Sequence, residues 1–160
     1  MFVLWYPKGN DLSLIAYIDE DFFGCIDDRQ SISGATLYLG ECLVSWLNKK
    51  QLSISLSTTE AEYIAATTCC TQVLWMKQTL TDIQVEYDDP IPIYCDNTNT
   101  ISISKKLVMH SKKKHIPIKY HFLREHVAEK NIRVKYVGTK ETPSYFYCKI
   151  NAFECLYYMS

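Results

Sequence analysis

Three acidic residues, Asp19, Glu62 and Asp96, stand where secondary-structure elements are expected to begin or end. Asp19 follows an apolar run at 13–18, Asp96 follows another at 91–95, and Glu62 lies near the start of a long helical pattern. The carboxyl ends of adjacent parallel strands meet at one edge of a sheet, where open α/β folds bind ligands. Carboxylates gathered there repel one another unless a cation neutralises them, so the three together predict a site for a hard divalent metal such as Mg²⁺.

The chemistry that such a site performs is phosphodiester hydrolysis. Two Mg²⁺ ions about 4 Å apart activate water and stabilise the leaving oxygen. Each Asp taken alone is better explained as a turn residue at the end of a strand. The spacing of the three acids therefore leaves both interpretations open.

The elements that must position these acids follow from hydrophobic periodicity and turn residues. The expected elements, in order, are strands at 13–19, 35–39 and 42–47, a helix at 57–81, a strand at 91–95, helices at 97–105 and 117–130, and a strand at 132–137. Ser57 with Glu60 forms a capping box at the start of the long helix, and Asn97 caps the next one. The order predicts an α/β domain with a hairpin at its front. Trp5, Trp46 and Trp75 are interpreted as core residues.

Composition sets the class of protein. The 160 residues suit one domain, and no apolar run reaches the roughly 18–20 residues of a membrane span. Seven cysteines without a Cys-x-x-Cys pair favour reduced thiols and an intracellular location. Residues 1–96 hold 5 Lys and Arg against 14 Asp and Glu, whereas residues 97–160 hold 12 against 4. This split fits two surfaces that attract each other, or an acidic metal centre beside a basic surface for a polyanion.

Candidate contacts to a nucleic acid lie in the basic half. Lys112, Lys113 and Lys114 form a cationic run that would neutralise phosphates without reading sequence, although a solvated loop explains it as well. Asn97 and Thr98, at a predicted helix start, would offer polar groups to a phosphate or a sugar hydroxyl.

Several short sequence words follow one another in a specific order. They occupy residues 16–24, 28–34, 44–46, 49–51, 56–63, 94–97, 114–115 and 120–124. The most specific is Leu-Ser-Thr-Thr-Glu-Ala-Glu-Tyr at 56–63, followed by Tyr-Cys-Asp-Asn at 94–97. Together these words resemble the ribonuclease H domain of copia-type retrotransposon Pol polyproteins, over about residues 6–141.

The resemblance implies a ribonuclease H-like fold, a five-stranded mixed sheet whose first three strands are antiparallel, with helices packed on it. It also implies Mg²⁺-dependent hydrolysis, with Mn²⁺ as a substitute, of the RNA strand in RNA–DNA hybrids. The catalytic and metal-binding acids then fall on Asp19, Glu62 and Asp96. The implied partners are the hybrid and the reverse transcriptase domain of the parent polyprotein, without a membrane. The implied location is the cytoplasm, in a virus-like particle, or the nucleus.

The resemblance fails near the end of the chain. The family places a fourth catalytic Asp where Tyr145 stands, and no Asp occurs after Asp96. We therefore expect a ribonuclease H-like domain at 1–141, with 1–12 a partial lead-in, and a divergent tail at 142–160 in place of the last helix. Catalysis is expected to be impaired unless Glu141 substitutes as a ligand. The alternatives are a non-catalytic nucleic-acid-binding or interaction module on the same fold, or a pseudogene product.

Overall fold

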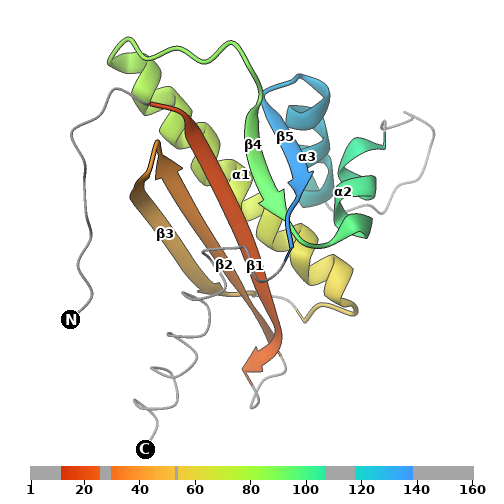
Figure 1. Ribbon diagram of the computed structural model, residues 1–160. Coiled ribbons are helices and arrows are strands. Elements are labelled where there is room, and N and C mark those ends of the chain that lie inside the picture. Colours follow the sequence, from red (N-terminus) through yellow and green to blue (C-terminus); the bar gives the residue numbers. More distant parts are fainter. Residues whose placement is uncertain (1–11, 26–29, 53, 107–117, 139–160) are drawn as a thin grey trace, which may run out of the picture.

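The computed structural model describes residues 12–25, 30–52, 54–106 and 118–138. Five strands form one sheet in the order β3-β2-β1-β4-β5 (Figure 1). The strands are β1 (Leu14–Cys25), β2 (Gln30–Leu39), β3 (Cys42–Lys50), β4 (Ile91–Cys95) and β5 (Ile132–Tyr136). The first three strands pair antiparallel with one another, whereas β4 pairs parallel to β1 and β5 pairs parallel to β4. The predicted five-stranded mixed sheet of the ribonuclease H-like fold is confirmed.

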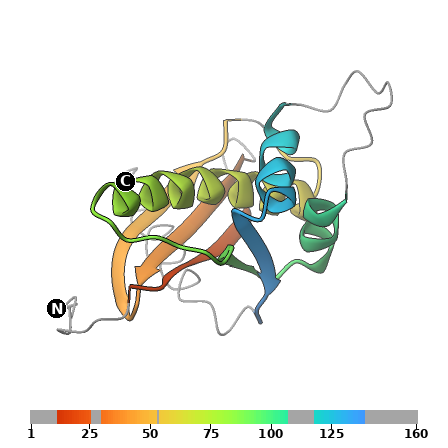
Figure 2. The ribbon, with the colours of Figure 1, turned by 90° about the horizontal axis from the view of Figure 1, so that it is seen from above.

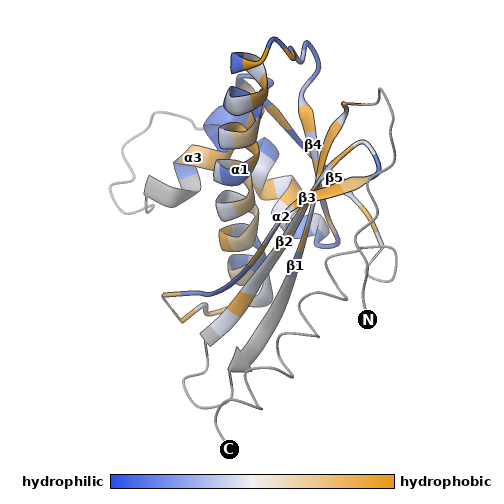
Figure 3. Ribbon diagram, turned by 90° about the vertical axis from the view of Figure 1, so that its left-hand side faces the viewer, coloured by the Kyte–Doolittle hydropathy of each residue, from blue (hydrophilic) through white to orange (hydrophobic). Residues whose placement is uncertain are grey.

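Three helices, α1 (Thr58–Asp82), α2 (Thr98–Lys105) and α3 (Ile118–Ala128), complete the described fold. Seen from above, α1 crosses one face of the sheet with α3 beside it (Figure 2). The edge-on view shows the same one-sided arrangement (Figure 3). Within the described residues, no helix combines the length and apolar character needed to cross a membrane.

The core lies between this face of the sheet and α1. In β1 the residues Leu14, Ala16 and Ile18 are buried, and their alternation gives the strand one apolar side. On α1, small side chains let the helix approach the sheet closely. The buried residues of α1 are Ala61, Glu62, Tyr63, Ala65, Ala66, Cys69, Cys70, Val73 and Leu80. Glu62 is the only charged residue among those, which sets it apart from its neighbours.

The interpretation of the tryptophans as core residues is wrong for two of them. Trp46 is 55% exposed because it lies on the edge strand β3, opposite Thr36 of β2, on the face of the sheet away from the described helices. Trp75 is 63% exposed because it stands two positions, about 200° of helical rotation, from buried Val73. Trp5 lies outside the described residues.

The first strand is longer than predicted. It does not end at Asp19 but continues to Cys25, because β2 keeps pairing with it after its pairing with β4 has ended. Asp19 is paired with Gly34, and Asp21 is paired with Ile32 further along. An antiparallel partner satisfies the backbone of these polar residues, which the apolar pattern alone cannot reveal. Asp19 therefore lies inside a strand, at the point where β1 passes the end of β4.

The start of α1 agrees with the capping prediction, with one shift. Ser57 accepts a hydrogen bond on Oγ from the backbone N–H of Glu60, at 3.1 Å. The Glu60 carboxylate accepts from the N–H of Leu56, at 2.9 Å, one residue before the expected position. Ser57 and Glu60 thus fix where the helix that carries Glu62 begins.

Candidate metal and nucleic-acid site

The parallel register between β1 and β4 runs toward two of the predicted acids, Asp19 and Asp96. Ala16 pairs with Ile93 and Tyr17 with Tyr94. Continued two residues beyond the last pair, this register would set Asp19 opposite Asp96, because neighbouring strands lie about 4.8 Å apart. This juxtaposition follows from the parallel arrangement, because both chains run in the same direction toward the same edge of the sheet.

The third predicted acid, on α1, contacts the end of β4. Glu62 is only 3% exposed, in the second turn of α1. Its Oε1 accepts a hydrogen bond from the thiol of Cys95, with an Sγ–Oε1 distance of 3.4 Å. Cys95 immediately precedes Asp96 in the chain. The side chain of Glu62 is therefore attached to the end of β4, next to the backbone that carries Asp96.

The pKa of the Cys95 thiol reflects its burial and the nearby charges of Glu62 and Asp96. Burial raises the pKa of the Cys95 thiol well above its ordinary value, and the negative charge of Glu62 raises it further. The charge of Asp96 acts in the same direction, with a smaller effect. Two of the predicted acids thus act on one thiol, which keeps its proton and remains a hydrogen-bond donor.

The side chains of the three acids do not form a ready-made ligand set. Within the part of the chain that the structure describes, no group of three or more His, Cys, Asp or Glu side chains could hold a metal ion. The donor types nevertheless fit Mg²⁺ and Mn²⁺, because these ions prefer carboxylate oxygens. Metal binding by Asp19, Glu62 and Asp96 stays a prediction that rests on their backbone positions.

A buried amide that the sequence interpretation missed anchors the segment leading to α1. Gln51 donates from Nε2 to Ser33 Oγ, at 2.8 Å, and to the carbonyl oxygen of Ala61, at 2.9 Å. Its Oε1 accepts from the hydroxyl of Ser55, at 2.8 Å. Gln51 is 5% exposed, so β2 and the residue preceding Glu62 are joined through a network shielded from water.

We expect Gln51→Ala to lower the free energy of unfolding by about 2–3 kcal/mol, because it leaves buried polar partners without hydrogen bonds. The matched control is Gln78→Ala, since Gln78 bonds only to an exposed neighbour on α1 among the contacts described, and should change stability by at most about 0.5 kcal/mol. Urea denaturation followed by circular dichroism measures both. Equal losses in the two variants would refute the anchoring role of Gln51.

The residues after Asp96 form a well-defined helix start. Asn97 accepts on Oδ1 from the N–H groups of Asn99, at 3.0 Å, and Thr100, at 3.1 Å. The predicted N-cap is thereby confirmed. The hydroxyl of Thr100 donates to the carbonyl oxygen of Thr59, at 3.2 Å, which joins α2 to the first turn of α1. Thr98 is exposed beside this cap.

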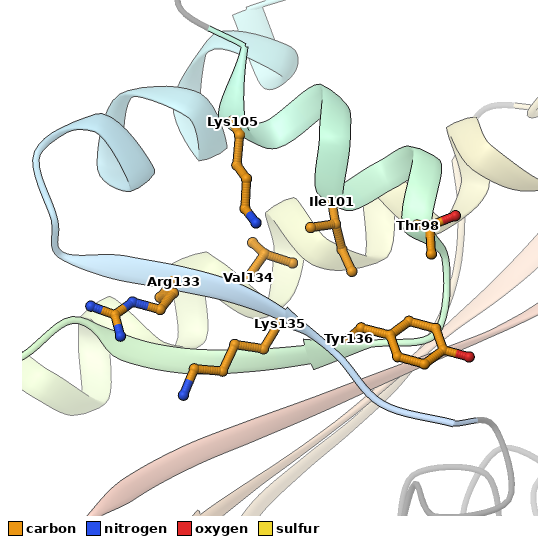
Figure 4. A pocket seen from close by; sticks show the side chains of 7 residues that line it. All are labelled: Thr98, Ile101, Lys105, Arg133, Val134, Lys135 and Tyr136. Carbon is orange, nitrogen blue, oxygen red and sulfur yellow. The ribbon is translucent and has the colours of Figure 1, made fainter.

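A pocket of about 340 Å³ lies between α2 and the edge strand β5 (Figure 4). It is lined by Thr98, Ile101, Lys105, Arg133, Val134, Lys135 and Tyr136. Lys105 extends from α2 toward β5, and Arg133 and Lys135 project from β5 itself (Figure 4). Thr98, which lines one end of this pocket, is two residues after Asp96 in the chain. The pocket with its three cationic residues therefore lies close in sequence to the candidate metal site. Apolar and basic residues alternate from Ile132 to Lys135, and this pattern could have predicted from the sequence that Arg133 and Lys135 are exposed on β5.

Other predicted features cannot be placed. Lys112, Lys113 and Lys114 lie outside the described residues, as do Glu141, Tyr145 and the rest of the divergent tail. Their proposed roles in nucleic-acid binding and in catalysis therefore stay predictions.

Comparisons with known proteins identify the origin of the chain. No family model matches it. It is 38% identical over 138 residues, 86% of its length, to the retrovirus-related Pol polyprotein from transposon RE2 of Arabidopsis thaliana. It is 36% identical over 149 residues, 91% of its length, to the corresponding polyprotein from transposon TNT 1-94 of Nicotiana tabacum. The chain spans only 10% and 11% of these two relatives.

A solved structure supports the fold. The protease-reverse transcriptase of prototype foamy virus superposes with a TM-score of 0.55 at 15% identity, over 92% of this chain and 20% of that one. At this identity the likeness concerns the fold alone, and it agrees with the sheet order and strand directions described above. The chain is thus a retroelement-derived domain with a ribonuclease H-like fold, homologous over most of its length to a segment of retrotransposon Pol polyproteins.

Proposed function

We propose that this domain binds RNA–DNA hybrid and a divalent metal ion, and that it cleaves the RNA strand only slowly. The observation that supports the proposal is the hydrogen bond between buried Glu62 and Cys95, the residue before Asp96, at the end of the strand whose parallel register with β1 runs toward Asp19. Carboxylates from a strand, a helix and a strand end suit a hard cation, and a metal-bound phosphate is the substrate class of such sites.

The roles of the three acids follow from their positions. Asp19, Glu62 and Asp96 would hold Mg²⁺ or Mn²⁺, which when bound supplies positive charge to the scissile phosphate. Burial of Glu62 excludes water from one side of the site and strengthens the electrostatic effect of its charge. Attachment to Cys95 and to the Gln51 network holds α1 in place, so that little reorganisation is needed when substrate binds.

The slow cleavage follows from the missing acid. Tyr145 stands where the family carries an Asp, and no other Asp follows Asp96. Losing one ligand of a two-metal site costs several kcal/mol of transition-state stabilisation, and each 1.36 kcal/mol is about tenfold in rate. The same observation favours a second candidate function, a non-catalytic nucleic-acid-binding module. Cleavage above background that is lost in Asp19→Asn would exclude that alternative.

The hybrid is proposed to contact the basic half of the chain. Lys105, Arg133 and Lys135 line the pocket between α2 and β5, and the same half of the sequence also holds Lys112 to Lys114. Phosphate contacts of this kind bind without sequence preference. The reverse transcriptase portion of the parent polyprotein is the proposed protein partner, in the cytoplasm or nucleus where reverse transcription would take place.

Affinity for RNA–DNA hybrid is expected to fall steeply with salt, and the triple variant Lys112→Ala, Lys113→Ala, Lys114→Ala should flatten that dependence. Each lost phosphate contact lowers the slope of log K against log salt by about 0.9. Fluorescence anisotropy with a labelled hybrid at several salt concentrations measures it. Lys77→Ala, on α1, is the control and should leave the slope unchanged. A slope equal to that of the unmodified chain would mean that the three lysines do not contact phosphate.

A further inference from the structure

Cys95 occupies the centre of the contacts that join the elements of the candidate site. We propose that Cys95 is a positioning residue: its S–H donates to Glu62 Oε1 and holds that carboxylate beside Asp96. The inference rests on the proposed metal site, because the group that it positions is one of the proposed ligands. Its own evidence is the hydrogen-bond geometry around the sulfur.

The first contact is the one to α1. Cys95 is fully buried and Glu62 nearly so, and the sulfur lies 3.4 Å from Oε1. A buried carboxylate requires hydrogen-bond donors, since otherwise its desolvation is costly. A thiol is a weak donor in water, but between two buried groups it has no solvent to compete with. The contact thus restricts the rotamers of Glu62.

The second contact is the one to the turn that carries Asp96. The sulfur of Cys95 accepts from the backbone N–H of Asn97, at 3.3 Å. The carbonyl oxygen of Asn97, at 3.6 Å, is a second acceptor for the S–H, but the Glu62 carboxylate is closer, at 3.4 Å, and is the stronger acceptor because it is charged. One thiol therefore donates to the helix that bears Glu62 and accepts from the residue after Asp96. Because Asn97 also caps α2, the turn has little freedom to move. This side chain thus links the two segments that carry the proposed ligands Glu62 and Asp96.

The chain position makes this role specific. Residues alternate in β4, with Ile91, Ile93 and Cys95 buried, so the side chain at 95 must point toward α1. An aliphatic residue there would fill the space without donating a hydrogen bond. Serine would retain a donor in a slightly smaller side chain. Cys95→Ser and Cys95→Ala therefore separate hydrogen bonding from packing.

The first test is infrared spectroscopy of the metal-free, full-length chain. The S–H stretching band of Cys95, identified by its loss in Cys95→Ala, should lie at lower wavenumber than that of Cys69, identified by Cys69→Ala. Cys69 is the matched control because it is equally buried, on α1. Glu62→Gln should move the Cys95 band upward, because a neutral amide is a weaker acceptor than a carboxylate. A Cys95 band that Glu62→Gln leaves in place would overturn the proposal.

The second test is Mn²⁺ binding by calorimetry. Cys95→Ala should weaken affinity about tenfold, as the loss of an outer partner of a metal ligand typically does. Cys95→Ser should retain the affinity of the unmodified chain, and so should Cys69→Ala, which removes the same volume from the core. Equal weakening in Cys69→Ala and Cys95→Ala would overturn the positioning role. An unmodified chain that binds no Mn²⁺, while its Cys95 band still responds to Glu62→Gln, would refute the metal site and leave the contact standing.

Discussion

Replacing residues 142–160 with a helix that carries Asp at position 145 is expected to raise hybrid cleavage about 10³-fold above that of the unmodified chain. Three of the four acids expected from the resemblance are present, so the unmodified chain should hold one ion well and a catalytic pair poorly. The added carboxylate restores the anchor on the side of the attacking water. Cleavage of a labelled RNA–DNA hybrid in Mg²⁺ measures the change.

Two controls make this result specific. The same helix with Asn at position 145 should give no gain, because it keeps the shape of the ligand without its charge. Adding Asp96→Asn to the rescued chain should abolish the gain again. Vigorous cleavage by the unmodified chain, lost on Asp19→Asn, would show that three acids suffice and that the predicted impairment of catalysis is wrong.

Asp96→Asn is expected to weaken Mn²⁺ binding by about 100-fold, since removing the charge of one ligand corresponds to about 3 kcal/mol. Asp96 directly follows Cys95, whose thiol is bonded to the second predicted acid, Glu62. Calorimetric titration of Mn²⁺ into the full chain measures the affinity.

Asp88→Asn is the matched control for this variant. Asp88 is exposed in the connection that leads into the start of β4, whereas Asp96 follows the end of that strand. Its substitution makes the same change in net charge and should leave Mn²⁺ affinity unaltered. Equal affinities for Asp96→Asn and Asp88→Asn would show that any bound ion is held elsewhere.

Most of the fold was predictable because its elements carry local signals. Alternating apolar residues indicated β4, with Ile91 and Ile93, and the capping residues Ser57 and Asn97 indicated where α1 and α2 begin. The strand order and directions came from the resemblance to the ribonuclease H family, since a one-dimensional pattern does not specify which strands pair.

What could not be predicted depends on tertiary contacts. The extension of β1 beyond Asp19 results from pairing with β2, and the polar residues there give no sequence signal for a strand. The exposure of Trp46 follows from its place on an edge strand, and the hydrophobicity of the residue alone cannot predict it. Cys95 and Gln51 acquire their roles from partners that are distant in the sequence. Cys95 contacts Glu62, 33 residues away, and Gln51 contacts Ala61, 10 residues away.

The convergence of the three acids around one cation is tested most directly by anomalous diffraction from crystals of the chain soaked in Mn²⁺. The account predicts an anomalous peak at the end of β4, with carboxylate oxygens of Asp19, Glu62 and Asp96 at about 2.0–2.3 Å from it. A fully occupied peak coordinated by other residues, or no peak at Mn²⁺ concentrations that saturate binding in solution, would contradict it.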